Sequence, residues 1–217
     1  MRVLGLDPSL TNFGLAVHDT EAKEAGRCVA RWRWQTKKKQ LFVTRYMEMR
    51  QRLISLITEH NVDRVGIEYP IFNALWSEGM YGLFLYSCEA LYESKADVVF
   101  FTPPQVKALA RESLGRPKGW KMLKADMVDT AKKDTNTKAR WNHNEADAYL
   151  VARSAGRFFL HLDSVLTADD LTEVEKKMFC REHTFSRGKR AGQTVKSGLI
   201  HREEDRFFLW SNDEGGV

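Results

Sequence analysis

Three acidic residues interrupt stretches of this sequence that otherwise have the composition of a protein core. Asp7 lies in VLGLDPSLTNFGLAV, Glu68 lies in RVGIEYP, and Asp147 lies in NEADAYLVA. A single buried carboxylate is costly, whereas several that converge can be neutralised together by divalent cations. Oxygen ligands suit Mg²⁺ or Mn²⁺, and two such ions roughly 3.5 to 4 Å apart activate water and stabilise the leaving oxygen in phosphodiester hydrolysis. The three positions therefore predict a two-ion hydrolytic site.

Each acid also has a purely structural explanation. Asp7 precedes Pro8 and suits a turn, Glu68 suits a charged strand end, and Asp147 suits a capping box with Asn144 at the start of a helix. For one residue alone the two explanations are evenly balanced. The joint pattern of three acids in core-like segments favours a shared site.

The elements that would position these acids follow from the spacing of apolar residues. Three successive strands are followed by helix, strand, helix, strand and helix, and a basic helix and a last core helix come after them. Such an order predicts an α/β fold with a mixed sheet flanked by helices. If the first and fourth strands are neighbours, Asp7 meets Glu68, and the last core helix delivers Asp147. The predicted elements are strands at 2–7, 13–18 and 27–35, a helix from 41 to 60, a strand at 64–70, a helix at 79–94, a strand at 98–102, a helix opened by Pro103 and Pro104, a basic helix reaching Lys133, and a core helix from Asn144 to Phe159.

The basic residues are unevenly distributed, and this indicates a polyanionic partner. The net charge is +5, but residues 103–140 hold ten basic against four acidic residues, and residues 181–202 hold six against one. Two separate basic segments favour nucleic acid, although surface charge for solubility explains any single lysine equally well.

Other features of the sequence indicate where in the cell the protein works. The sequence has no apolar run of about 18 residues and no signal-peptide pattern, so we expect a cytoplasmic protein without a membrane partner. The three cysteines are far apart and fit reduced thiols. Residues 163–217 resemble an appendage to a main domain at 1–162, with a helix at 167–179 capped by Thr167, a basic loop at 185–193 and a hairpin formed by 194–201 and 205–211.

Four segments in order resemble the motifs of RuvC-type Holliday-junction resolvases, which are RNase H-like nucleases. They are GLDPSLTNFGLAV, IEYP, FTPPQVKALA and NEADAYLVA, and together they cover roughly residues 1–160. The resemblance implies a five-stranded mixed sheet of order βββαβαβα. It also implies a homodimer that uses Mg²⁺ or Mn²⁺ to cleave four-way DNA junctions by paired symmetric nicks.

The resemblance also assigns roles to individual residues. Asp7, Glu68 and Asp147 match the metal-binding acids of the family, and Lys107 and Lys124 fall near its basic residues that contact DNA or support catalysis. An aromatic residue after the second motif would stack on or separate bases, for which Tyr69, Phe72 and Trp76 are candidates beside ordinary core packing. The expected DNA-binding set is Tyr69, Phe72, Lys107, Lys118, Lys121, Lys124, Arg187, Lys189 and Arg190.

One position departs from the family pattern. An Asp or His three residues before the last acid often supplies a fourth ligand, and here that residue is Asn144. Asn144 and His143 share the helical face of Asp147, whereas Glu145 points away. We expect Asn144 to offer an uncharged carbonyl oxygen to the metal, with His143 as a substitute if the helix begins one residue earlier.

Three other functions remain open from the sequence. The protein could be a less selective nuclease of flaps, forks or other branched DNA. It could also be a junction-binding protein with weakened catalysis, because Asn144 replaces the charged fourth ligand of the family. An actin-like phosphotransferase is disfavoured, because the sequence has no second glycine-rich phosphate loop and is short for a two-domain ATPase.

Overall fold

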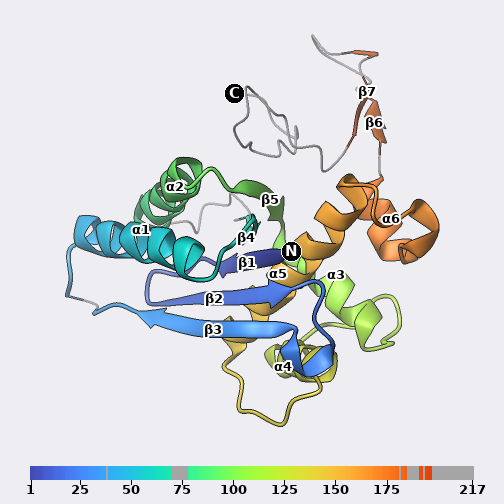
Figure 1. The fold of residues 1–217 in the computed structure, drawn as a ribbon, viewed down its shortest axis with the longest axis horizontal. Helices are drawn as coiled ribbons and strands as arrows, with labels where there is room; N and C mark the ends of the chain where they lie inside the picture. Colours follow the sequence, from blue (N-terminus) through green and yellow to red (C-terminus); the bar gives the residue numbers. More distant parts are fainter. Residues whose placement is uncertain (38, 70–77, 181, 185–190, 193, 197–217) are drawn as a thin grey trace.

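A five-stranded mixed sheet organises the molecule (Figure 1). The computed structural model describes residues 1–37, 39–69, 78–180, 182–184, 191–192 and 194–196. The helices and strands are β1 (Arg2–Asp7), β2 (Asn12–Asp19), β3 (Cys28–Gln35), α1 (Phe42–Glu59), β4 (Arg64–Glu68), α2 (Glu78–Glu93), β5 (Asp97–Phe101), α3 (Pro103–Ser113), α4 (Lys124–Thr135), α5 (His143–Leu162), α6 (Glu173–Phe179), β6 (Glu182–Thr184) and β7 (Thr194–Lys196). Two short 3₁₀ turns lie at Glu24–Gly26 and Ala168–Asp170. The predicted fold class is confirmed.

The strand order is β3-β2-β1-β4-β5, so β1 and β4 are neighbours, which is the condition for Asp7 to meet Glu68. β1 pairs with β2 antiparallel and with β4 parallel, and the register places Gly5 opposite Gly66. Strands β1 to β3 form a meander, and the two crossovers to parallel strands carry α1 and α2. The carboxyl ends of β1 and β4 therefore meet at the same edge of the sheet.

Alternating residues of each strand pack into two separate cores, one on each face of the sheet. Leu4 and Leu6 of β1 belong to the core under α1 and α2, which also contains Val65 and Ile67 of β4. Val3 belongs to the opposite core, which α3, α4 and α5 cover. Because side chains alternate, Gly5, Asp7, Gly66 and Glu68 all lie on the α5 face.

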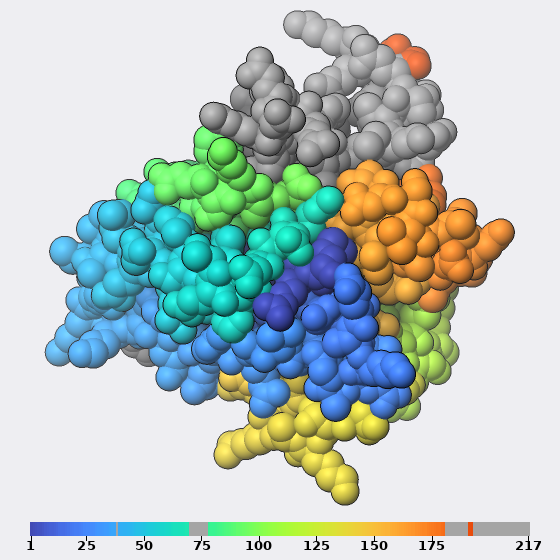
Figure 2. Space-filling model, viewed as in Figure 1, coloured from blue at the N-terminus to red at the C-terminus, as the bar shows by residue number. Residues whose placement is uncertain are grey.

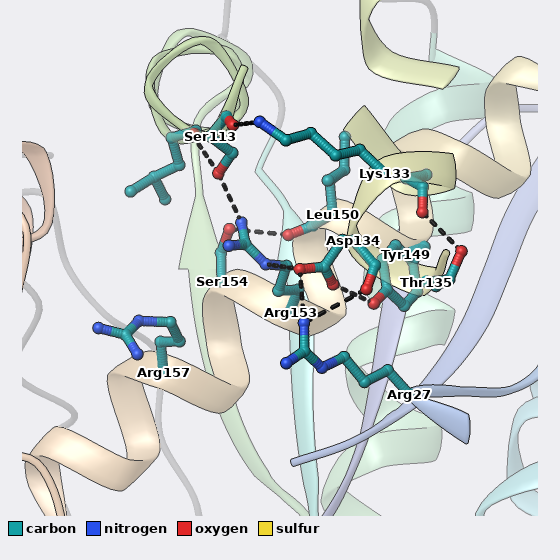
Figure 3. Close-up of polar contacts among 12 residues, drawn as sticks. Arg27, Ser113, Lys133, Asp134, Thr135, Tyr149, Leu150, Arg153, Ser154 and Arg157 are labelled. Carbon is teal, nitrogen blue, oxygen red and sulfur yellow. Dashed lines mark hydrogen bonds and ion pairs between the residues drawn. The ribbon is translucent and has the colours of Figure 1, made fainter. Parts of the chain in front are cut away.

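A partly buried ionic cluster fastens the helices on that face (Figure 3). Asp134 near the end of α4 accepts hydrogen bonds from Arg27 at 3.1 Å and from the Tyr149 hydroxyl, and it forms an ion pair with Arg153 of α5 at 3.1 Å. Arg153 also donates to Ser113 Oγ at the end of α3 at 2.9 Å. The cluster ties α3, α4 and α5 to one another, so it fixes the relative positions of the helices that carry Lys107, Lys124 and Asp147.

His18 is buried beside this cluster and makes the protein sensitive to acid. Desolvation lowers the pKa of His18 from 6.5 to about 4, and Arg153 also lowers it, whereas Asp134 and a hydrogen bond with the Arg27 backbone raise it. Because the pKa is depressed in the folded state, stability is full above about pH 6.5 and falls as pH drops toward 4, by about 3 kcal/mol for this residue. We expect denaturant unfolding between pH 7 and 4 to show a shallower loss of stability in His18→Phe than in the unsubstituted protein, because all other groups are shared. Equal slopes would contradict the assignment.

The C-terminal part differs in detail from its prediction. Thr167 caps only a 3₁₀ turn, and α6 begins five residues later with Thr172, whose hydroxyl accepts from Glu175 N at 3.2 Å. The short strand at 194–196 pairs with the preceding residues 182–184, and the expected partner at 205–211 lies outside the described residues. α6 packs Phe179 against Phe101 and Phe158 of the main core. The boundary near residue 162 stays a prediction.

Among the helices in the described part of the chain, none is both long and apolar enough to cross a membrane.

Candidate active site

Asp7, Glu68 and Asp147 come from three elements that meet at one edge of the sheet. Asp7 is the last residue of β1, and Glu68 is the last residue of the adjacent parallel strand β4. Asp147 lies in the second turn of α5, which crosses the same face of the sheet. The topology thus brings together acids that are 61 and 79 residues apart in the sequence.

Glycines at the crossing point let α5 lie close to the strands. A Cβ atom on Gly5 would stand 1.9 Å from the Ala148 carbonyl oxygen, and one on Gly14 would stand 2.1 Å from that of Asn144. Both obstacles are helix backbone, which cannot rotate aside. Only glycine permits this approach, and the approach sets the distance between Asp147 and the two strand acids.

The three carboxylates interact strongly in the absence of a counter-ion. Burial and the charges of Glu68 and Asp147 raise the pKa of Asp7 well above its ordinary value, although Lys124 opposes the effect. Burial and Asp147 raise the pKa of Glu68 to about 7, and burial raises that of Asp147 to about 6 against the influence of Lys107 and Lys124. Such an arrangement is costly unless positive charge is supplied.

The ligand atoms that Asp7, Glu68 and Asp147 offer are of the kind that divalent cations bind. They are carboxylate oxygens, and Asp147 Oδ1 is buried with no hydrogen-bond partner among the described residues. No three acidic, histidine or cysteine side chains in the described ranges are gathered closely enough to enclose one ion. Cations bound at this edge of the sheet would offset the mutual repulsion of the three carboxylates.

The start of α5 corrects two expectations. The helix begins at His143, one residue before the predicted Asn144, and Asn142 is the N-cap that accepts from Asn144 N at 2.9 Å. The capping-box acid is Glu145, so Asp147 is not needed for that role. Asp147 instead lies in the second turn of α5, on the side of the helix that faces the sheet.

Asn144 is buried, and its amide already makes a structural contact. Nδ2 donates to the Asn12 carbonyl oxygen at 2.6 Å, which fastens the start of α5 to the start of β2. The amide group is thereby oriented by the protein itself. A ligand role for its remaining oxygen stays a prediction.

Two lysines flank the carboxylates. Lys107 of α3 lowers the pKa of both Glu68 and Asp147, and Lys124 at the start of α4 lowers the pKa of Asp7 and Asp147. Lys124 Nζ also lies 3.2 Å from His143 Nε2. Both lysines are exposed, so their ammonium groups stand between the buried acids and solvent.

The other expected DNA contacts divide into three groups. Lys118 and Lys121 are exposed in the connection between α3 and α4. The Tyr69 ring packs at 5.5 Å from both Phe84 and Phe100, which is the core-packing alternative, so base stacking by Tyr69 stays a prediction. Phe72, Trp76, Arg187, Lys189 and Arg190 lie outside the described residues.

Sequence reasoning missed Arg33 and Arg140, which line a groove beside Lys124. In the sequence Arg33 is only one residue of the predicted strand at 27–35, and Arg140 is only one of the ten basic residues in 103–140. The pairing of Arg33 with Gly14, which lies under the start of α5, is a tertiary feature that the local pattern does not encode.

Comparison with solved structures shows what fold this arrangement belongs to. RuvC of Thermus thermophilus is similar with a TM-score of 0.61 and 20% identity, over 76% of this chain and 97% of that chain. The same protein in complex with a Holliday junction substrate is similar with a TM-score of 0.58 and 19% identity, over 75% and 96%. No protein-family model matches the sequence, and neither does a curated protein sequence. The chain therefore has a RuvC-like fold, as its four motifs suggested.

Proposed function

We propose that this protein is a metal-dependent endonuclease that resolves four-way DNA junctions by paired symmetric nicks, acting as a cytoplasmic homodimer. The observation that carries the proposal is the meeting of Asp7, Glu68 and Asp147 between two lysines, on a RuvC-like fold. RuvC itself has been solved with a Holliday junction substrate, which supports the choice of branched DNA.

Each residue has a definite task in this proposal. Asp7, Glu68 and Asp147 would hold two Mg²⁺ or Mn²⁺ ions, with Asn144 as an uncharged fourth donor. When bound, the ions would supply an activated water and stabilise charge on the leaving oxygen. Lys107 and Lys124 would attract the scissile phosphate and hold it over the carboxylates.

A cleavage assay on labelled DNA tests the proposal. Junctions, flaps, forks and plain duplex are compared in Mg²⁺ and in Mn²⁺ at one salt concentration, because electrostatic binding alone does not select junctions. We expect two symmetric nicks in the junction and little cleavage of the other substrates. Equal cleavage of flaps and forks would favour the less selective nuclease, and tight binding without turnover in either metal would favour a junction-binding protein.

The homodimer has a candidate surface on α1 and α2. Phe42, Val43 and Met47 of α1 are 50%, 52% and 51% exposed, and Leu85 of α2 is 63% exposed. The starts of the two helices are joined by a 2.9 Å hydrogen bond from Tyr46 OH to the Gly79 carbonyl, so the exposed apolar residues lie on two helices that pack side by side. An exposed apolar surface of this kind is typical of an interface between protein chains.

Self-association should therefore depend on Leu85. We expect Leu85→Glu to weaken dimerisation at least about tenfold, because a carboxylate would be buried in an apolar interface. Val165→Glu is the matched control, since Val165 is 64% exposed and lies beyond α5. Sedimentation velocity over a range of protein concentrations measures the effect. If the two variants associate equally, the interface lies elsewhere.

A further inference from the structure

A polar groove of about 650 Å³ opens next to the carboxylate site, between β3 and the starts of α4 and α5. Lys124 lines the groove, and its charge also acts on Asp7 and Asp147. The groove therefore adjoins the site from the side of β3. The connection between α4 and α5, residues 136–142, forms part of its wall and projects from the body of the molecule (Figures 1 and 2).

The cations of this groove lack acidic partners among the described residues. Within the described ranges, Arg33, Lys124 and Arg140 make no ion pair. The acids of the groove are Asp129 and Glu145, and Glu145 is already paired with Arg31 at 3.0 Å. The arginines that do pair with acids are Arg2, Arg27, Arg31, Arg50, Arg64, Arg153 and Arg157. The unpaired positive charge of the groove is thus available to an anionic ligand.

The wall beneath these cations is rigidly built. Arg31 stacks over the Trp141 ring with its Cζ 4.1 Å from the ring centroid, and its Nη2 donates to the Arg140 carbonyl oxygen at 3.0 Å. Trp141 is only 6% exposed, yet its indole Nε1 has no hydrogen-bond acceptor among the described residues. The buried indole therefore belongs to the wall of the groove, and the exposed cations present its charge to a ligand.

We propose that this groove binds the sugar-phosphate backbone of the DNA strand that leads to the carboxylate site. Arg33 and Arg140 would neutralise backbone phosphates beyond the scissile one, above the wall formed by Trp141 and Arg31. They are positioning residues: they hold the strand so that the scissile phosphate reaches Lys124 and the three acids. The inference rests on the proposed function, since it presumes DNA as the substrate.

Binding and cleavage are measured separately to test the groove. The binding assay is fluorescence anisotropy of a labelled four-way junction with Asp7→Asn protein in EDTA, at several salt concentrations. We expect Arg33→Ala with Arg140→Ala to weaken binding at least about tenfold and to reduce the slope of log K against log salt by about 2, because two phosphate contacts are lost. Lys23→Ala with Lys177→Ala removes the same charge from exposed residues that do not line the groove, and should change binding less than about twofold.

Two further variants separate the contributions. Trp141→Phe keeps an aromatic ring under Arg31 and leaves the charges of the groove unchanged, so the affinity and the salt slope should stay close to those of the parent. Cleavage is measured in protein that keeps Asp7. There the double arginine variant should have a higher KM for the junction, while its kcat changes little. Should the alanine variants melt at a lower temperature than the parent, Arg33→Gln with Arg140→Gln replaces them.

The outcomes distinguish the groove from the nuclease. If the parent protein cleaves the junction and the arginine variant binds as tightly as the lysine control, the groove assignment is wrong and the nuclease stands. If no junction is cleaved but the arginine variant still loses affinity and salt dependence, the nuclease is wrong and the groove stands as a DNA-binding site.

Discussion

Asp7→Asn is expected to abolish junction cleavage and, at the same time, to make the metal-free protein more stable. Asp7 lies at the end of β1, where burial and the charges of Glu68 and Asp147 raise its pKa. Because the pKa of Asp7 is raised in the folded state, the native protein loses stability as pH rises above the ordinary pKa of an Asp. At neutral pH the buried charge of Asp7 therefore destabilises the native state. Asparagine keeps the shape of the side chain and removes that charge.

The expected sizes are large for activity and modest for stability. Loss of the charged ligand shared by the proposed ions should reduce cleavage at least about 1,000-fold. In EDTA near pH 7.5 the melting temperature should rise by at least about 2 °C. Added Mg²⁺ should stabilise the parent protein by binding its native state, and should stabilise Asp7→Asn much less.

Asp169→Asn is the matched control for both measurements, because it removes the same charge from an exposed position. It should leave cleavage, melting temperature and the response to Mg²⁺ close to those of the parent. Full cleavage by Asp7→Asn would remove Asp7 from the site. A lower melting temperature in EDTA would show that Asp7 has a structural role instead.

Gly5→Ala is expected to impair both folding and catalysis, although Gly5 bears no functional group. The added Cβ would stand 1.9 Å from Ala148 O and 2.5 Å from Ala152 N, and both atoms belong to the α5 backbone. The helix must move away from β1, which should cost at least about 3 kcal/mol of the free energy of unfolding. A displacement of Asp147 by about 1 Å should reduce cleavage about 100-fold in the protein that does fold.

Two other glycines make this prediction falsifiable. Gly26→Ala is the control, because the atom nearest to its new Cβ would be Ala22 Cβ, at 3.3 Å. In Gly66→Ala the nearest obstacle is the Ala155 side chain at 2.7 Å, so adding Ala155→Gly should restore part of the lost stability. Urea unfolding and junction cleavage measure the two effects. A Gly5→Ala protein as stable and active as the control would show that α5 does not depend on this close approach.

The local sequence determined the secondary structure and the candidate acids. Short, nearly continuous apolar runs identified the strands that carry Asp7 and Glu68, since a strand with two buried faces needs apolar residues at nearly every position and an acid there stands out. The order of strands and helices allowed β1 to lie beside β4, because few arrangements are open to such a chain. The site acids were therefore visible before the fold was known.

Only the tertiary structure decided how the site is set and what surrounds it. The roles of Gly5 and Gly14 depend on a helix more than 120 residues away in sequence, and nothing local marks them. The orientation of Asn144 is decided by the Asn12 carbonyl, a partner that neither its type nor its spacing indicates. Arg31 and Arg33 look alike in the sequence, yet one is bound to Glu145 while the other lines the groove. Propensity and periodicity act over a few residues, whereas close packing and charge pairing join residues that only the folded chain brings together.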